Sequence, residues 1–431
     1  MIANPSLERL NAALSAVQLR LPTTPLIEPP LAAKGFSSIE LFTGAGGLAL
    51  GTHAAGFHHE ALVEWNADAC NTLRTNIRAG SVSGIGHWSV VEGDVRDFIR
   101  KLGESNLGAL DLVAGGAPCQ PFSIGGKHRG IDDRRNMIPF FTEIVQWTQP
   151  KAFILENVRG LLRPGFREYF DYVILCLTFP WAGRLPDETW LDHAGRLGKV
   201  DHEQRSDDPT YRVQYALVNA ADYGVPQVRH RVFIVGLRDD IAGDFQFPEP
   251  SHSFDSLLFE QWMTGEYWER HEISTPQSVP AEFVSRVKQL RTAPCPNLPW
   301  CTVRDAVGDL PIPTREDAIM IRNHRLNPGA RAYVGHSGSS WDLPSKALKA
   351  GDHGVPGGEN TLRTGDVAIR YYTVREAARI QAFPDEWVFE GTWSETMRQL
   401  GNGVPVTLAS AVAGAVARHL AANGSRWRNA S

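Results

Sequence analysis

The stretch SIELFTGAGGLALG, residues 38–51, decides the fold class of this chain. Its apolar start predicts a short buried strand, and the glycines that follow predict a tight turn into a helix. Gly44, Gly46 and Gly47 let the backbone approach a ligand closely, and a helix N-terminus offers free N–H groups there. The glycine spacing is neither G-x-G-x-x-G nor that of a phosphate loop, so the turn alone indicates only a nucleotide-like ligand.

Further apolar runs follow this one as far as residue 247 and alternate with longer helical patterns. Such alternation predicts a mostly parallel sheet with helices on both faces. The last two runs are too close in sequence for a helical crossover, so we expect them to pair antiparallel. The expected strands include residues 39–42, 61–64, 110–114, 152–155, 215–219 and 231–237.

The pattern changes along the chain and predicts its organisation. Residues 1–34 read as a leader helix and linker, and residues 181–210 are polar and read as a surface insertion. Between residues 248 and 372 periodicity fades while Pro, Gly and His become frequent, as in functional loop regions. Helical patterning returns at residues 373–383 and 405–420. We therefore divide the chain into four segments: 1–34, 35–247, 248–372 and 373–431.

The composition is that of a soluble globular protein, with 42% hydrophobic and 21% charged residues. The chain shows no apolar run near the roughly 20 residues of a membrane span and no signal peptide, so we expect a cytoplasmic protein. Its five cysteines lack metal-type spacing, so we expect free thiols and no metal. The net charge is −5, but residues 313–375 carry nine Lys or Arg against six Asp or Glu, a local basic excess that suits nucleic acid.

Three groups of polar residues at expected strand ends could carry chemistry. Cys119, in LDLVAGGAPCQPFSIGG (residues 110–126), lies in a loop after a strand, where a thiolate nucleophile would sit; alternatively, it is a small buried hydrophobe. Glu156 follows another apolar run and is a candidate acid. Arg229 and Arg231 share one face of a strand and suit a phosphate or a base carbonyl, unless they only mark a solvated strand end.

Two more strand ends suit an adenosine-containing cofactor. Glu64 stands where a carboxylate would grip ribose hydroxyls, and Trp65 beside it could stack on adenine. Asp94 stands at the next strand end, although a turn aspartate is the simpler alternative. Together with the glycine turn, they favour such a cofactor.

These stretches resemble the motifs of the cytosine-C5 DNA methyltransferases of bacterial restriction–modification systems. The resemblance also rests on ENVRGLL (156–162), NAADYGVPQVRHRVFIVG (219–236), TVREAARIQAFPDEW (373–387) and QLGNGVP (399–405). The motifs stand in the family's order and cover most of residues 38–247 and 373–415.

The resemblance implies a Rossmann-like α/β sheet dependent on S-adenosylmethionine, with a smaller irregular target-recognition domain at residues 248–372, inserted before the C-terminal helices. It implies methyl transfer to C5 of a cytosine flipped out of a specific duplex DNA site, through a covalent Cys119–C6 adduct and without a metal. It further implies a monomer, and a restriction endonuclease that acts on the same site without stable contact. The last helix should pack beside the first strand.

The resemblance also implies a role for each matching residue. In catalysis, Cys119 adds to C6, Glu156 bonds or protonates N3, and Arg231 holds O2 with Arg229 beside it, while Gln120 belongs to the same loop as Cys119. Cofactor-binding residues are Phe42, Gly44, Gly46, Glu64, Trp65, Asp94, Pro118 and Asn402. DNA contacts come from Ser123, Lys127 and Arg129 in a mobile loop. Outside the matching motifs, the polar donors available in the recognition domain are Arg322, His324, Arg325, Arg331, Lys346, Lys349, His353 and Arg363; alternatively, these residues only cap the catalytic domain.

Three other functions fit the sequence less well. A transfer-RNA cytosine methyltransferase shares the catalytic loops but carries a Cys-Phe-Thr signature that this chain lacks. A non-catalytic relative would lose the Pro-Cys or Glu-Asn-Val residues, which are intact, and a dehydrogenase fails on the glycine spacing. The target sequence cannot be read from the chain, because base readout depends on where a few side chains lie in the major groove.

Overall fold

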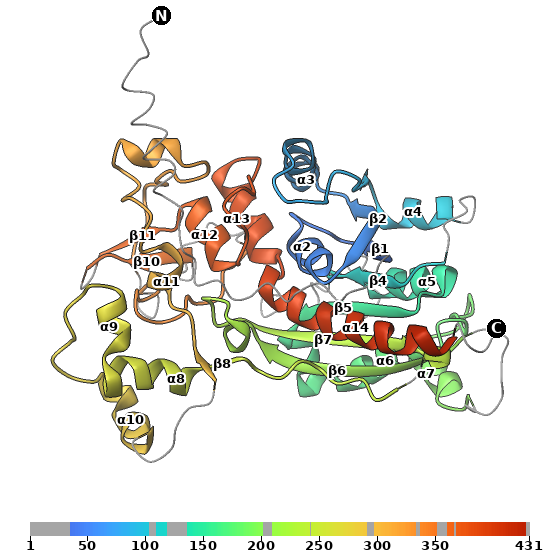
Figure 1. The fold of residues 1–431 in the computed structure, drawn as a ribbon. Coiled ribbons are helices and arrows are strands. Elements are labelled where there is room, and N and C mark those ends of the chain that lie inside the picture. Colours follow the sequence, from blue (N-terminus) through green and yellow to red (C-terminus); the bar gives the residue numbers. More distant parts are fainter. Residues whose placement is uncertain are drawn as a thin grey trace, which may run out of the picture.

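The computed structural model describes residues 35–102, 109–118, 136–200, 209–241, 243–290, 297–332, 337–350, 360–365 and 368–427 (Figure 1). The leader expected at residues 1–34 lies outside this part of the chain.

A seven-stranded sheet forms the centre of the fold, in the order β3-β2-β1-β4-β5-β7-β6. Its strands are β1 (Phe36–Leu41), β2 (Phe57–Glu64), β3 (Val90–Glu92), β4 (Leu112–Gly115), β5 (Ala152–Val158), β6 (Tyr211–Asn219) and β7 (His230–Arg238). Strands β1 to β5 pair parallel, and β7 pairs antiparallel with both β5 and β6. The α/β class, the mostly parallel sheet and the antiparallel last pair are therefore confirmed.

Strand beginnings differ most from the sequence prediction. Strand β2 starts at Phe57 and β6 at Tyr211, each four residues before the expected start. The first residues of β2 alternate between buried and exposed side chains, and most of the first seven residues of β6 are exposed or half-buried. An apolar run therefore marks only the inner part of each strand.

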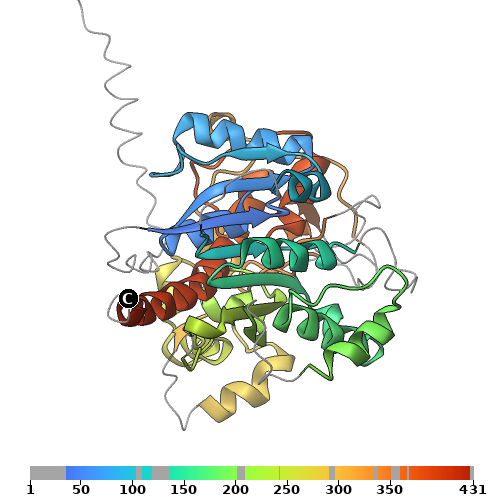
Figure 2. The same cartoon turned by 90° about the vertical axis from the view of Figure 1, so that its right-hand side faces the viewer.

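Helices cover both faces of the sheet. Residues of α4, α5 and α6 share one hydrophobic cluster with β1, β4 and β5, whereas α2 and α14 share another cluster on the opposite face. Figure 2 shows α14, in red, and the teal and green helices on opposite sides of the strands. The helices of the catalytic part are α2 (Gly47–Ala54), α3 (Ala67–Ala79), α4 (Val95–Leu102), α5 (Ile138–Thr148), α6 (Arg167–Thr178), α7 (Trp190–Leu197), α12 (Val374–Ile380), α13 (Trp393–Asn402) and α14 (Val406–Trp427).

The last helix closes the fold against the helix that follows the first strand. Gly51 of α2 is necessary for this contact, because a Cβ there would lie 2.4 Å from the Cβ of Ala409 in α14. The resemblance implies that the last helix packs beside the first strand; its main contact is with α2, the helix that directly follows that strand. By length and composition the helical stretch Trp393–Asn423 could cross a membrane, but 72% of its most apolar window is buried inside the protein, as in a core helix.

The region at residues 248–372 contains short helices and strands. Some of its buried residues form local clusters, and others join a cluster of the catalytic part. Residues of α8 and α10 pack in small clusters of their own, whereas Val303, Leu348 and Leu362 belong to a cluster shared with α2, α12 and α13. The later half of this region is therefore packed onto the catalytic part. Its elements are β8 (His252–Ser253), α8 (Phe254–Phe259), α9 (Glu266–Arg270), α10 (Val284–Leu290), β9 (Leu298–Pro299), α11 (Val303–Val307), β10 (Thr361–Arg363) and β11 (Ile369–Tyr371).

Candidate active site

The carboxyl ends of the parallel strands are aligned by the strand register. Leu41 at the end of β1 pairs with Val63 on one side and Gly115 on the other, and Gly115 pairs with Leu155 of β5. Strand β7 runs in the opposite direction and therefore begins at this same edge. The predicted site residues that follow these strands are thus brought to one edge of the sheet.

The turn after β1 leaves open space at one glycine and is closely packed at the other. Phe42 and Gly44 both have φ of 57°, and a Cβ at Gly44 would meet nothing within 4 Å. Gly46 has φ of 94°, and a Cβ there would lie 3.1 Å from the ring of Trp387. Gly44 therefore offers backbone to a ligand, while Gly46 allows the C-terminal part to pack against the turn.

Glu64 is held rigidly at the end of β2. Its Oε2 accepts a hydrogen bond from Gly44 N at 2.7 Å, and its Oε1 accepts from Trp65 N at 3.0 Å and Asn66 N at 2.8 Å. Burial raises the pKa of this carboxyl, and the three N–H groups oppose that rise. Trp65 beside it is 73% exposed, which leaves its ring free to stack on a ligand.

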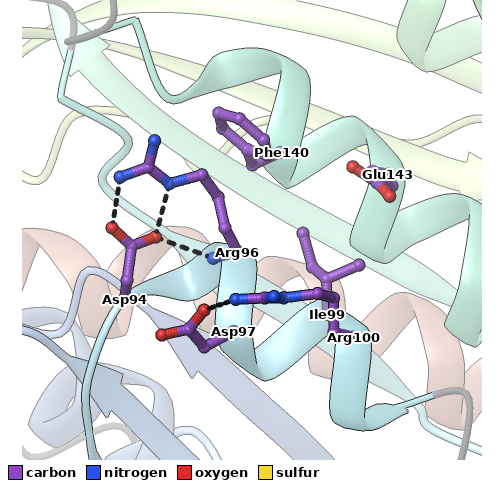
Figure 3. A pocket seen from close by; sticks show the side chains of 7 residues that line it. All are labelled: Asp94, Arg96, Asp97, Ile99, Arg100, Phe140 and Glu143. Carbon is purple, nitrogen blue, oxygen red and sulfur yellow. Dashed lines mark hydrogen bonds and ion pairs between the residues drawn. The ribbon is translucent and has the colours of Figure 1, made fainter.

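Asp94, after β3, lines a hollow of about 510 Å³ with Arg96, Asp97, Ile99, Arg100, Phe140 and Glu143 (Figure 3). Arg96 binds Asp94 in a fork: Nε donates to Oδ1 at 2.8 Å and Nη2 to Oδ2 at 2.5 Å. The guanidinium also lies 5.9 Å from the centre of the Phe140 ring. Hydrogen bonds from Arg96 hold the pKa of Asp94 below its ordinary value, so Asp94 remains an acceptor at neutral pH.

Two other expected cofactor residues are accessible from solvent. Asn402 is exposed at the C-terminal end of α13, and Pro118 is exposed three residues after β4.

Glu156 and Arg231 form a buried ion pair at the centre of the edge. They come from the neighbouring strands β5 and β7, and Glu156 Oε1 lies 2.8 Å from Arg231 Nε. Burial is the main cause of a raised pKa at Glu156, although Arg231 and then Arg229 act against it. The Glu156 carboxyl can therefore hold a proton at higher pH than an exposed glutamate.

The stem of the cysteine loop is fixed beside this pair. Asn157 Nδ2 donates to Ala117 O at 3.1 Å, and Met137 N donates to Pro118 O at 3.1 Å. A Cβ at Gly116 would lie 3.2 Å from Glu156 Oε2. Cys119, Gln120, Ser123, Lys127 and Arg129 lie outside the described residues.

Arg229, which the resemblance places beside Arg231 at the base, has a buried side chain. Its side chain is 1% exposed, and its guanidinium donates to the carbonyl oxygens of Leu348, Gly401 and Gly403. It is therefore packed inside the protein, near the Glu156–Arg231 pair.

The expected recognition residues fall into three groups. Arg322, Arg325, Arg331, Lys346, Lys349 and Arg363 are exposed. His353 lies outside the described residues. His324 is 1% exposed, and its ring nitrogens contact Thr373 Oγ1 and Pro311 O, so the expectation that it is an available donor is wrong.

Two further cations follow Glu156 in the chain, and neither is among the predicted site residues. Arg159 and Arg163 are exposed on the short helical turns that follow β5, and neither forms an ion pair with another described residue. Arg159 is close enough to contribute to the lowered pKa of His230, after burial. Their four-residue spacing directly after Glu156 was visible in the sequence.

Comparison with known proteins identifies the family. The profile described as C-5 cytosine-specific DNA methylase matches residues 36–178 and 202–418, and passes over most of the segment interpreted as a surface insertion before residue 202. Type II methyltransferase M.NgoMIV of Neisseria gonorrhoeae is 33% identical over 387 residues, which cover 88% of this chain and 96% of that protein. Type II methyltransferase M.Eco47II of Escherichia coli is 34% identical over 382 residues, covering 88% and 78%.

Solved structures agree on the fold. A DNA modification methyltransferase encoded within an E. coli prophage has a TM-score of 0.50 at 23% identity, covering 90% of this chain and 99% of that one. A mutant of Spodoptera frugiperda DNMT2 has a TM-score of 0.51 at 14% identity, covering 88% and 99%. With the profile spanning most of its length, the chain belongs to the C-5 cytosine-specific DNA methylase family and is a DNA cytosine-5-methyltransferase.

Proposed function

We propose that this enzyme methylates C5 of a cytosine flipped out of duplex DNA, through a covalent bond between Cys119 and C6. The observation that carries the proposal is the buried Glu156–Arg231 pair, 2.8 Å apart, beside the anchored stem of the Pro118-Cys119 loop. A carboxyl with a raised pKa and a fixed guanidinium at one sheet edge match the edge of cytosine that bears N3 and O2, and Cys119, directly after Pro118 in the chain, supplies the nucleophile.

The chemistry follows from what each side chain can do. C5 of cytosine is a poor nucleophile until the Cys119 thiolate adds to C6 and pushes electrons into the ring. Glu156 provides a proton or hydrogen bond at N3, and Arg231 holds O2, so that the ring can accept this charge. After C5 has gained the methyl group and lost its proton, the C6–S bond breaks and the thiolate is restored. Unstacking the base costs a few kcal/mol, which protein contacts offset.

The residues at the strand ends fit S-adenosylmethionine, which when bound supplies the electrophilic methyl group. We assign Phe42 and Trp65 to the adenine faces and Asp94 to its amino group. A carboxylate has about four acceptor positions, so Asp94 can accept this bond beside the three from Arg96. Glu64, which likewise accepts three N–H groups, keeps one position for a ribose hydroxyl. We also assign Gly44, Gly46, Pro118 and Asn402 to the cofactor-binding site.

The assignment to DNA is tested with radiolabelled S-adenosylmethionine and two substrates, duplex DNA and transfer RNA. We expect label in the duplex only. Label in transfer RNA alone would show that the active site acts on transfer RNA instead of DNA. The proposal also places the enzyme in a type II restriction–modification system with a separate nuclease. It further includes a monomeric state and a cytoplasmic location.

We further propose that residues 248–372 choose the target sequence, through the exposed donors Arg322, Arg325, Arg331, Lys346, Lys349 and Arg363, with His353 as a further donor. Some of these will contact only phosphates, which position the protein without reading sequence.

A chimera tests this recognition role. Residues 248–372 replace the equivalent segment of a relative with a different known site, and we expect the chimera to methylate the target of this chain. A second version keeps the relative's own residues at 345–349, because Ser345 pairs with the backbone of the catalytic part at Pro226 and Val228. Methylation of the framework's original site by an active chimera would contradict the proposal.

Arg159 and Arg163 are proposed as contacts to the DNA backbone next to the flipped base. Replacing both with alanine should weaken binding of all duplex sequences alike and reduce the slope of log affinity against log salt by about 0.9 for each lost contact. Arg167 provides a matched control, because it is already paired with Asp171 at 2.9 Å. An unchanged slope in the double variant, or an equal change in Arg167→Ala, rules out the assignment.

A further inference from the structure

Arg229 is a buried cation that donates only to neutral oxygens among the described residues. Nη1 donates to Leu348 O at 2.8 Å and Gln227 Oε1 at 3.3 Å, and Nη2 donates to Gly401 O at 2.5 Å and Gly403 O at 3.0 Å. The nearby Glu156 carboxylate is occupied by Arg231. Burying a charge without its own carboxylate is costly, so these four oxygens indicate a specific structural task.

The oxygens belong to segments that are far apart in the sequence. Gly401 and Gly403 flank Asn402, to which the proposed function assigns the amino-acid part of the cofactor. Leu348 belongs to the proposed recognition region, in a segment anchored where Ser345 O accepts from Val228 N at 2.9 Å. Arg229 itself lies two residues before Arg231, at the base-binding end of β7.

Two buried glutamines extend the same connection. Gln227 Oε1 accepts from Leu348 N at 3.0 Å, and Gln227 Nε2 donates to Gln381 Oε1 at 3.2 Å. Gln381 Nε2 in turn donates to Leu400 O, one residue before Gly401. Both glutamine side chains are fully buried.

The backbone around Gly401 is closely packed against the backbone of the segment that contains Leu348. A Cβ at Gly401 would lie 2.3 Å from the carbonyl carbon of Lys349. The C-terminal end of α13 around Asn402 and the segment around Leu348 are therefore in direct contact, with the Arg229 guanidinium bonded to both.

We propose that Arg229 is a positioning residue that fixes the C-terminal end of α13, at Asn402, and the Leu348 segment against the base-binding end of β7. Through it, cofactor binding, target recognition and the placement of Arg231 are energetically coupled, since none of the three segments can shift without breaking hydrogen bonds to one guanidinium. Arg229 acts through these segments and makes no contact with the base. The inference rests on the proposed roles of Asn402 and of residues 248–372.

The test is Arg229→Lys, which keeps the charge but loses the planar fork that reaches oxygens on two segments. Calorimetry measures the affinity for S-adenosylhomocysteine, with and without a duplex that contains the target. We expect at least a tenfold loss of affinity for S-adenosylhomocysteine. We also expect the factor by which the duplex enhances this affinity to fall towards one.

Arg375→Lys is the matched control. Arg375 is also 1% exposed and also donates to carbonyl oxygens, those of Arg322, Pro384 and Trp387. Its Nη1 in addition lies 3.6 Å from Asp385 Oδ1, and none of these partners belongs to the C-terminal end of α13 around Asn402. This variant should lose thermal stability, as Arg229→Lys does, yet bind S-adenosylhomocysteine as wild type does. Should Arg229→Lys not fold, Gln227→Leu removes the neighbouring bonds and is expected to lower the affinity in the same direction.

Two outcomes overturn the inference. If Arg229→Lys binds S-adenosylhomocysteine as Arg375→Lys does, with the enhancement by duplex intact, Arg229 is only structural. If Arg229→Lys binds S-adenosylhomocysteine normally but no longer forms a trapped covalent complex with a duplex that contains 5-fluorocytosine at the target, Arg229 contacts the base. A failure of the proposed function looks different, because wild type itself would then not be trapped.

Discussion

Replacing Cys119 with alanine is expected to abolish methyl transfer to DNA while leaving duplex and cofactor binding largely intact. The proposed mechanism has no other group that can add to C6, and without that addition C5 does not accept the methyl group. The described residues support the position of this cysteine: Ala117 and Pro118, directly before it, are held by hydrogen bonds from Asn157 and Met137.

Covalent trapping measures this prediction directly. A duplex with 5-fluorocytosine at the target should trap wild type, because the fluorine blocks the loss of a proton from C5 that elimination requires. Cys119→Ala should not be trapped, and trapping of this variant contradicts the assignment.

The cysteines that the structure does describe, Cys70, Cys176 and Cys301, supply matched controls. Burial raises the pKa of Cys70 to about 12, of Cys176 to about 11 and of Cys301 to about 12. These thiols are protonated at neutral pH and are poor nucleophiles. Cys176→Ala and Cys301→Ala should therefore be trapped as wild type is.

The sheet and its functional edge could be predicted from the sequence because both depend on local patterns. A buried parallel strand is a short apolar run, and the residue after it lies at the carboxyl edge wherever the strand falls in the sheet. Glu64, Asp94 and Glu156 could thus be placed on one edge before their neighbours were known. The strand order that brings them together required the structure.

What the sequence did not reveal depends on contacts between distant segments. Arg229 looks like a second base-binding cation by its spacing from Arg231, but its partners Leu348 and Gly401 are 119 and 172 residues away. His324 is buried for a similar reason, through Thr373, 49 residues further on. Periodicity within one strand or loop carries no information about such partners.

Replacing Glu156 with glutamine is expected to slow methylation by about 10²- to 10⁴-fold, the usual contribution of a general acid or base. Glutamine keeps the shape and can still contact Arg231, but it cannot deliver a proton to N3. Single-turnover methylation measures the chemical step, and calorimetry with S-adenosylhomocysteine should show nearly wild-type binding. A variant that loses cofactor binding but keeps its single-turnover rate would contradict the role given to Glu156.

The pH dependence separates proton transfer from simple loss of an ion pair. Because burial raises the pKa of Glu156, the protonated form persists to higher pH than in an exposed glutamate, and the wild-type rate should fall as pH rises through that value. The glutamine variant should lack this decline. Glu376→Gln is the matched control, since Glu376 is 2% exposed and paired with Arg370 at 2.6 Å outside the site. It should keep both the rate and its decline, whereas an equal loss in both variants would reduce Glu156 to a structural partner of Arg231.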